Sequence, residues 1–183
     1  ETGLDAIVQL PGNAFYNTPI ATYIWIVMKN KPVTHQGKVQ LIDASACASS
    51  RRKNIGEKKV DITKACRDLI IEAYGAYVND TYNGVDENNN TIVVKSKVMD
   101  AVDLGYNKIV VETPQFDEDG NVIMKKKKPV ADTSKRDTEN VPLAEDIDDY
   151  FEREVIPYNP QAWIDKSKTK VGYEIPFTRT FYE

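Results

Sequence analysis

Two apolar runs lie near the start of the chain, Leu4–Leu10 and Ile20–Met28, and a loop rich in Pro, Gly and Asn joins them. Runs of seven to nine residues rich in Ile, Val, Tyr and Trp predict buried β-strands, and the residues between them predict an ordered loop at the mouth of a sheet. A third run, Val39–Ile42, follows the turn at Gly37 and predicts another strand. The pattern therefore predicts a group of strands that presents one loop.

The middle of the chain changes to helical periodicity. Apolar residues at helical spacing predict a helix at about 62–78, which Asp61 or Thr63 would cap. The basic and irregular stretch Arg51–Lys64 predicts a loop before the helix, and the polar stretch Asn79–Asn90 predicts another after it. We therefore expect the helix to lie between two solvated loops.

Weaker patterns in the second half predict short elements separated by polar segments. The expected elements are strands at Thr91–Lys95 and Lys108–Glu112 around a helical turn at about 97–103, an Asp-Gly hairpin at 116–123, a solvated excursion that runs from Lys125 to Asn140, an acidic helix at about 143–155 that Pro157 stops, and an aromatic tail at 162–182 with few helix signals. This order of elements predicts an α+β region.

Composition limits the classes of partner. The chain has 183 residues, of which 41% are hydrophobic, and this is ordinary for a globular protein with a moderate core. Its net charge of −4 and pI of about 5.2 argue against a protein coated with phosphate contacts, but not against a local basic groove. The longest apolar run is far shorter than the roughly 20 residues that span a membrane, so we expect no membrane partner.

Few residues offer metal, nucleotide or nucleophile chemistry. Cys47, Cys66 and His35 are the only cysteines and histidine, which leaves a zinc site without ligands and favours two reduced thiols in a cytoplasmic protein. The glycines are too widely spaced for a phosphate-binding loop. Asp117–Gly120 lacks the spacing of a calcium loop and predicts a hairpin turn, while the carboxylates between 145 and 154 fit a solvated helix face. We therefore expect no metal site and no Ser/His/Asp-type catalytic set.

The adjacent aromatics of the first loop, Phe15 and Tyr16, are the first candidate site. Turn-forming residues surround them and would support the loop: Pro11, Gly12, Asn13 and Asn17. A pinned backbone would leave the rings at a rim, where stacking on a nucleobase contributes about 1–3 kcal/mol per base. The alternative is that both rings pack in a core, as aromatics beside a sheet normally do.

Basic residues after the third strand are the second candidate. They are Arg51, Arg52, Lys53, Lys58 and Lys59. Contacts to DNA phosphates are one interpretation of this group, and a solvated charge run is the other. We interpret Lys125–Lys128 as a solvated run at the tip of a loop.

The chain resembles the late part of the catalytic domain of the modification (HsdM) subunit of type I restriction–modification systems in LDAIVQLPGNAFYNTPIATYIWIVMKN and the following GKVQLIDAS. Similar blocks continue through RRKNIGEKK, LGYNKIVVETP, DTENVPLAEDIDDYFEREVIPYNPQAWID and KTKVGYEIPFTRTFY, so the resemblance covers nearly the whole chain. It implies an α/β fold in which residues 1–45 are the last strands of a Rossmann-like class I methyltransferase sheet, with its antiparallel hairpin end. Residues 46–183 would be an α+β extension that serves assembly.

The resemblance implies an adenine-specific DNA methyltransferase that transfers a methyl group from S-adenosylmethionine to the exocyclic amino group of adenine. The family's Gly-rich cofactor loop and its Asn-Pro-Pro-aromatic motif are not in this chain, whose Asn159-Pro160 continues differently. We therefore expect no catalytic residue, no bound cofactor and no activity of this piece alone. The family's aromatic after the LP-G element would stack on the extruded adenine, and it corresponds to Phe15, with Tyr16 as neighbour and substitute.

The implied partners are DNA, a specificity (HsdS) subunit and a restriction (HsdR) subunit in the cytoplasm. Because a strand is under way by Leu4 without an initiator Met, we expect a piece of a longer protein. Its centrally buried strands would then lack neighbours, so the chain's tail or a second copy is expected to cover Leu4–Leu10 or Ile20–Met28. The alternative function is a non-enzymatic module that binds protein or nucleic acid.

Overall fold

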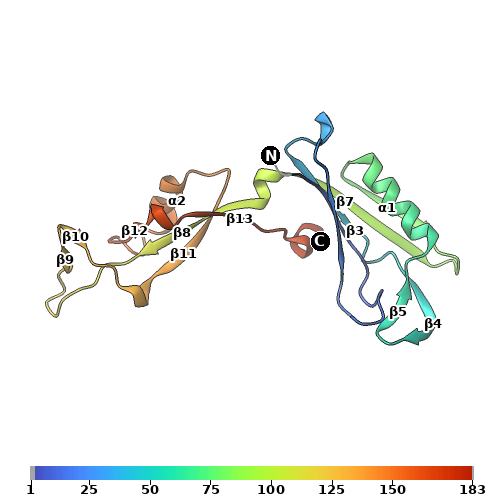
Figure 1. Ribbon diagram of the computed structural model, residues 1–183, viewed down its shortest axis with the longest axis horizontal. Helices are drawn as coiled ribbons and strands as arrows, with labels where there is room; N and C mark the ends of the chain where they lie inside the picture. The colour runs from blue at the N-terminus through green and yellow to red at the C-terminus, as the bar shows by residue number, and fades with distance from the viewer. Residues whose placement is uncertain (1–2, 183) are drawn as a thin grey trace. The chain divides into compact units, whose positions relative to one another are not determined.

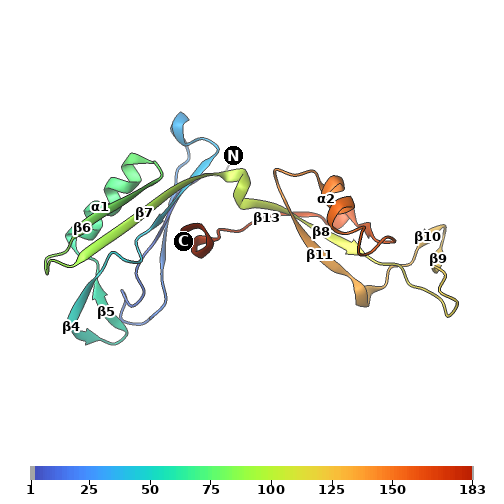
Figure 2. The same ribbon diagram turned by 180° about the vertical axis from the view of Figure 1, so that it is seen from behind.

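The computed structural model describes residues 3–182, which form two compact units (Figures 1 and 2). Unit 1 contains residues 3–101 together with the returning segment 176–182, and unit 2 contains residues 102–175. Each unit is built around its own sheet, and each is described by itself.

A five-stranded sheet of order β2-β1-β3-β7-β6 forms the centre of unit 1. Its strands are β1 (Leu4–Gln9), β2 (Tyr23–Val27), β3 (Lys38–Asp43), β6 (Asp80–Val85) and β7 (Thr91–Asp100). β1 and β3 are parallel, and the other neighbouring strands are antiparallel. The strands predicted from the first and third apolar runs are therefore confirmed as β1 and β3.

Helix α1 (Lys64–Ala76) covers one face of this sheet (Figure 1). It begins after Thr63, whose side-chain oxygen accepts a hydrogen bond from the backbone N–H of Cys66 at 3.3 Å. The predicted helix and one of its two predicted caps are thus confirmed. The thiols of Cys47 and Cys66 are free, as predicted, and burial followed by the neighbouring thiol raises the pKa of Cys47.

The apolar face of α1 and the inner strands share one core. Its buried members are Val8, Leu10, Ile42, Ala44, Cys47, Cys66, Ala73, Ile92 and Val94. The β-branched residues suit the pleated strands, and the small residues let the helix approach them closely.

The tail of the chain covers the opposite face of the sheet. Helix α3 (Phe177–Phe181) and α1 lie on opposite sides of the strands in both views (Figures 1 and 2). The ring of Phe177 meets the ring of Tyr23 edge-on, with centroids 5.4 Å apart. The expectation that the tail covers one of the first two apolar runs is therefore confirmed at Tyr23 of β2, while most of the other side chains of β2 stay exposed.

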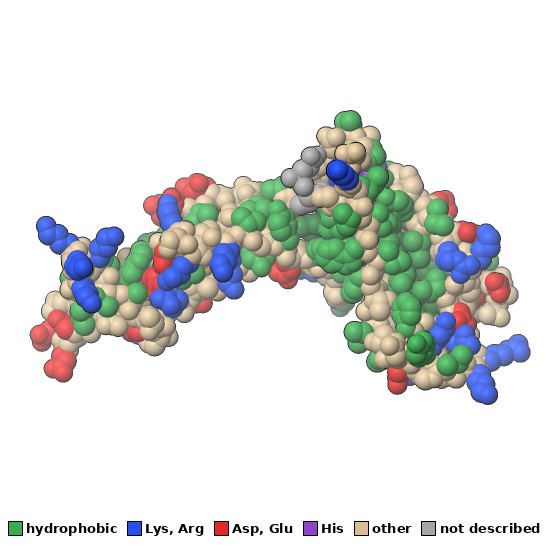
Figure 3. All heavy atoms as spheres, viewed as in Figure 1, with side chains coloured by type: hydrophobic (Ala, Val, Ile, Leu, Met, Phe, Trp, Pro, Cys, Tyr) green, Lys and Arg blue, Asp and Glu red, His purple; other side chains and the backbone are tan. Residues whose placement is uncertain are grey.

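The strand predicted at Ile20–Met28 is confirmed as β2, but its predicted burial is wrong, because β2 lies at the sheet edge and is largely exposed. Trp25, for example, is 62% exposed, and hydrophobic side chains form much of the visible surface of unit 1 in Figure 3. No described strand pairs with the outer edge of β2. An apolar strand is buried only where another strand or helix covers it, so apolar composition alone did not predict that β2 is an exposed edge strand. That a second copy of the chain covers β2 stays a prediction.

Two segments that were predicted to be loops form strands. The stretch Arg51–Lys64 lies largely in an antiparallel hairpin of β4 (Ser49–Ile55) and β5 (Lys58–Asp61). The polar stretch Asn79–Asn90 contains β6, which pairs with β7. Backbone hydrogen bonds form these pairs whatever the side chains are, which explains why polar composition misled the prediction.

Strand β8 (Gly105–Glu112) is the centre of the unit 2 sheet and confirms the strand expected there. It pairs along one side with β11 (Asp137–Pro142) and along the other with β12 (Trp163–Ile164) and β13 (Lys170–Tyr173). β11 begins inside the predicted solvated excursion; its residues 137–140 form a strand, but they are largely exposed, as the prediction of a solvated segment requires. β13 lies in the tail for which no strand was predicted.

Helix α2 (Ile147–Glu154) packs on this sheet and confirms the predicted acidic helix in a shorter form. Asp146 caps it by accepting hydrogen bonds from the backbone N–H groups of Asp148 and Asp149, at 2.9 and 3.1 Å. Its buried residue, Phe151, joins a core with Ile109, Val111 and Val141.

An arm of two turns leaves the end of β8. Its first turn is the predicted Asp-Gly hairpin, in which the backbone N–H of Gly120 donates to the carbonyl of Asp117 at 3.1 Å. Its second turn joins β9 (Met124–Lys125) to β10 (Lys128–Pro129). Single turns of 3-10 helix complete the described chain at Val33–His35, Ala101–Leu104, Thr133–Lys135 and Lys166–Lys168.

The mixed α/β architecture is confirmed. The chain passes from unit 1 to unit 2 after residue 101 and returns to unit 1 after residue 175. Residues 46–101 complete the sheet that residues 1–45 begin, since β7 pairs with β3. The assignment of residues 1–45 to a Rossmann-like catalytic sheet and of 46–183 to assembly stays a prediction. Within residues 3–182, no helix is both long and apolar enough to cross a membrane.

Candidate nucleic-acid interface

The loop between β1 and β2 is closed by its own backbone. The N–H of Leu10 donates to the carbonyl of Thr22 at 2.8 Å, and the N–H of Asn13 donates to that of Pro19 at 3.1 Å. Gly12 lies against this crossing, where a Cβ atom would come within 3.0 Å of the Pro19 oxygen. Closure at two levels fixes the path of the loop.

Asn13 docks the loop onto the β4–β5 hairpin. Its amide Nδ2 donates to the carbonyl of Glu57 at 3.0 Å, while its own carbonyl accepts from the N–H groups of Lys59 and Val60 at 2.9 and 3.3 Å. The N–H of Glu57 donates to the carbonyl of Tyr16 at 3.0 Å. Asn13 has a φ of 56°, a left-handed conformation that Asn tolerates better than most residues.

Gly56 makes this docking sterically feasible. It stands at the hairpin turn with a φ of +56°, and a Cβ atom there would lie 2.5 Å from the carbonyl oxygen of Tyr16. Only a residue without a side chain lets the two backbones approach this closely.

The two aromatic rings remain at the surface of the docked loop. Phe15 is 42% exposed and Tyr16 is 68% exposed, so the alternative of core packing is not what the structure has. Pro11 is buried beneath the loop, and Asn17 is exposed. The supporting role of Asn17 stays a prediction.

Two of the five candidate cations are engaged inside the hairpin. The Arg51 guanidinium contacts both carboxylate oxygens of Asp61 at 2.6 and 2.5 Å, and the Lys58 ammonium lies 3.0 Å from one of them. These contacts, that of Arg51 first, hold the pKa of Asp61 below its ordinary value. Arg51 and Lys58 therefore stabilise the hairpin.

The other three candidates present charge to solvent. Arg52 and Lys53 are exposed, and neither forms an ion pair with any residue between 3 and 182. Lys59 is 3.9 Å from Glu57, a weak surface pair. The structure thus brings the aromatic loop and the basic segment together, which the sequence did not predict.

Asp86 joins the start of β4 to the turn between β6 and β7. Its carboxylate accepts hydrogen bonds from the hydroxyl of Ser49, from the N–H groups of Asn88 and Asn90 at 2.8 Å each, and from the Asn90 amide at 3.0 Å. These donors, Ser49 first, hold the pKa of Asp86 well below its ordinary value. They therefore fix the base of the hairpin.

Replacing Asp86 with asparagine is expected to lower the melting temperature by several degrees at neutral pH, and the difference should shrink in acid. A carboxyl whose pKa is depressed by folding contributes stability above its unfolded pKa, near 3.9, and loses it as pH falls through the folded value. Thermal denaturation between pH 7 and pH 3 measures this, with the exposed neighbour variant Glu87→Gln as control. A difference that stays constant over this range would contradict the role of the carboxylate.

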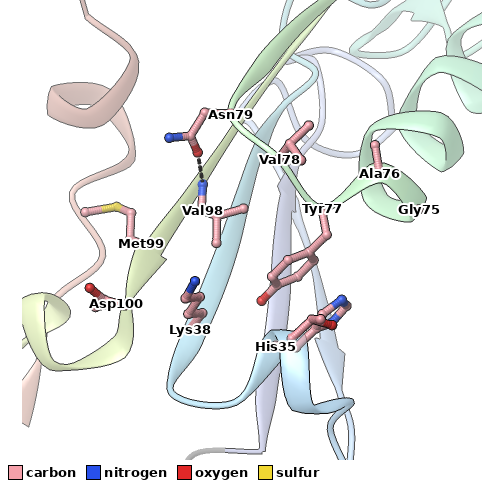
Figure 4. Close-up of a pocket in the computed structure, with 11 residues that line it drawn as sticks. His35, Lys38, Gly75, Ala76, Tyr77, Val78, Asn79, Val98, Met99 and Asp100 are labelled. Carbon is pink, nitrogen blue, oxygen red and sulfur yellow. Dashed lines mark hydrogen bonds between the residues drawn. The ribbon is translucent and has the colours of Figure 1, made fainter.

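A pocket of 630 Å³ lies beside the end of α1, lined also by the segment that leads into β3 and by the end of β7 (Figure 4). Tyr77 ends α1 in a left-handed conformation, with φ of 51°, and its ring stacks on that of His35 with centroids 3.4 Å apart. On the pocket wall, the Asn79 side-chain oxygen accepts from the N–H of Val98 at 2.6 Å.

The buried carboxylate of Asp5 explains this arrangement. His35 Nδ1 lies 3.0 Å from it, the Tyr74 hydroxyl donates to it at 2.8 Å, and the Lys31 ammonium is 3.8 Å away. Burial first, and then the Asp5 carboxylate, raises the pKa of both Tyr74 and Tyr77 to about 12. This cluster, which the sequence did not predict, fastens the segment before β3 to α1. Among the described residues, no three His, Cys, Asp or Glu side chains are grouped to hold a metal ion.

Comparison with known proteins assigns the family. Residues 1–118 match the sequence model of the N-6 DNA methylases. A solved structure described as the type I restriction-modification system methyltransferase subunit from Streptococcus thermophilus is 23% identical, with a TM-score of 0.39 over 54% of this chain and 17% of that chain. This chain therefore spans only a small part of the length of that structure. No curated protein matches. Because the family model covers more than half of the sequence, this chain belongs to the N-6 DNA methylase family.

Proposed function

We propose that this chain is part of the modification subunit of a type I restriction–modification system and supplies a DNA-contacting surface to adenine methylation. Phe15, with Tyr16 beside it, would stack on the extruded adenine. Arg52, Lys53 and Lys59 would contact the DNA backbone. DNA, a specificity subunit and a restriction subunit are the proposed partners.

The docking of the hairpin turn onto the aromatic loop carries this proposal. Base stacking and phosphate contacts are complementary parts of nucleic-acid binding, and both residue types belong here to one docked pair of segments. The hydrogen bonds of Asn13 and the close approach of Gly56 to Tyr16 hold them together. A base that leaves the helix loses stacking with its neighbours, and a preformed aromatic face recovers part of that energy.

S-adenosylmethionine is the methyl donor that we propose for the parent protein. The residues of this chain do not fit it, since the sequence has no Gly-rich phosphate-type loop and no Asn-Pro-Pro-aromatic motif. The part proposed for this chain is therefore to position the base and the DNA backbone. Methyl transfer is a displacement in which such positioning lowers the barrier.

The double variant Arg52→Gln/Lys53→Gln is expected to weaken DNA binding uniformly across sequences. Each lost phosphate contact should make the slope of log K against log salt shallower by about 0.9. Fluorescence anisotropy of the chain with a labelled duplex, at several salt concentrations, measures this slope. The control is Lys108→Gln/Lys170→Gln, which removes the same charge from unit 2. Equal slopes for the two double variants would contradict the basic half of the interface.

A further inference from the structure

We propose that the β9–β10 hairpin of unit 2 is a separate contact site for the sugar–phosphate backbone of duplex DNA. The hairpin contains four consecutive lysines, Lys125 to Lys128, and the middle two form its turn. The family match ends at residue 118, before this segment begins. The inference rests on the proposed function only in taking DNA as the ligand.

The arm that carries the hairpin is held by backbone hydrogen bonds. The N–H of Gln115 donates to the carbonyl of Val130 at 2.8 Å, and the N–H of Ile123 donates to that of Gln115 at 2.9 Å. Nearer to β8, the N–H of Asp132 donates to the carbonyl of Thr113 at 2.8 Å. The lysines are therefore presented by an ordered structure.

At the base of the arm, the carboxylate of Glu112 is neutralised by two nearby cations. The carboxylate of Glu112 is buried, and it accepts from Arg136 Nε at 2.8 Å and from Lys168 Nζ at 3.0 Å. Burial raises the pKa of Glu112, but Lys168 and Arg136 together outweigh this effect and lower it. Neutralising this carboxylate therefore does not require the lysines of the turn.

The lysines of the turn destabilise it, because two of them adopt left-handed conformations and two face each other across the hairpin. Lys126 and Lys127 have φ values of 49° and 64°, so both central residues are left-handed. Asn-Gly adopts such a two-residue turn readily, whereas lysine does so at a cost in conformational energy. Lys125 and Lys128 stand directly opposite each other, and like charges in that position repel.

Nothing in the described chain offsets these costs. All four lysines are exposed, and none forms an ion pair with a described residue. The acidic turn, Asp117–Gly120, is nearby in sequence, but Lys/Arg and Asp/Glu side chains at this end of unit 2 gather in two separate groups (Figure 3). Strained local choices without internal compensation are characteristic of functional sites.

A polyanion supplies the missing compensation. Duplex DNA has one negative charge per about 1.7 Å of helix axis, so a cluster of ammonium groups can meet successive phosphates. Lysine is a flexible point charge that suits phosphate contact and does not by itself read sequence. The hairpin would therefore add affinity without specificity.

The test is the double variant Lys126→Asn/Lys127→Gly in the 183-residue chain. Asn-Gly keeps the turn and relieves its strain, so the melting temperature should stay the same or rise. DNA affinity should nevertheless fall about tenfold or more at low salt, and the slope of log K against log salt should become shallower by about 1.8. Anisotropy with a labelled 30-base-pair duplex gives both values.

The outcome is compared with the control Lys108→Gln/Lys170→Gln, which removes the same net charge. An unchanged binding curve, a loss no larger than that of the control, or no binding by the unchanged chain would overturn the inference. Binding of an acidic protein instead of DNA would also leave the DNA curve unchanged and so overturn it. If Arg52→Gln/Lys53→Gln weakens binding and Lys126→Asn/Lys127→Gly does not, the proposed function stands and this inference fails.

Discussion

Under the proposed function, replacing Phe15 with alanine in the complete methyltransferase is expected to reduce DNA methylation about 5- to 150-fold. The ring is 42% exposed on a loop whose backbone is closed and docked, so it can meet a flat base without reordering the loop. Stacking contributes about 1–3 kcal/mol per base, and 1.4 kcal/mol corresponds to a factor of ten. Single-turnover methyl transfer measures the rate, and 2-aminopurine fluorescence at the target position measures base extrusion.

Two further variants make this experiment specific. Phe15→Trp keeps an aromatic face and should retain most activity. Tyr158→Ala removes an exposed ring, 88% exposed, from unit 2 away from the β9–β10 arm and should change neither readout. Unchanged methylation and unchanged fluorescence in Phe15→Ala would remove the ring from the mechanism.

Replacing Gly56 with alanine is expected to destabilise unit 1 by about 2–5 kcal/mol and to detach the hairpin from the aromatic loop. The left-handed φ costs a non-glycine residue about 1–2 kcal/mol. The added Cβ would also lie 2.5 Å from the Tyr16 oxygen, so the turn must move and the hydrogen bonds of Glu57 and Lys59 to the loop are lost. Lost hydrogen bonds contribute about 0.5–1.5 kcal/mol each. Chemical denaturation measures the stability, and amide hydrogen exchange at these two N–H groups measures the docking.

Gly37→Ala is the matched control. Gly37 has a φ of +70° in the same unit, but a Cβ atom there would meet nothing within 4 Å. It should show the conformational cost alone, with normal protection of the Glu57 and Lys59 amides. Equal destabilisation by the two variants would show that the close approach to Tyr16 contributes nothing.

The elements predicted correctly are those with a complete local signal. β1 and β3 have short apolar runs that contain β-branched residues, and α1 combines helical spacing with a capping residue, Thr63. The acidic helix α2 has an apolar stripe that ends in the buried Phe151. In each case the residues that determine the element lie within it.

The failures have a different physical origin. β6 and the β4–β5 hairpin are polar, and backbone pairing forms them. β2 is apolar enough for a central strand, yet it lies at an edge. β7 is also longer than predicted, because pairing with β3 extends it to Asp100. Neighbours that are distant in sequence decide such cases, and local composition does not identify them.

The candidate interface shows the same division. Residue type alone singled out Phe15 and Tyr16, and separately the basic segment. Their docking depends on Asn13 and Glu57, which are 44 residues apart. Of the residues that hold the docked segments, only Gly56 and Asn13 could have been identified from residue type, because both adopt left-handed conformations. This signal is weak, because Gly and Asn are common in any turn.

The amino-acid sequence by itself determined the family, the two core strands β1 and β3, and the main helix α1. It also identified the loop of turn-forming residues that carries Phe15 and Tyr16. These features depend on residue identity and local spacing. Tertiary structure alone decided that the basic hairpin docks on that loop and that the tail packs against Tyr23 of β2. It also decided that Asp61 engages Arg51 and Lys58 but not Arg52 and Lys53. The physical reason is that backbone hydrogen bonds and close approaches between distant segments depend on where the chain brings them, and side-chain identity specifies that position only through the whole fold.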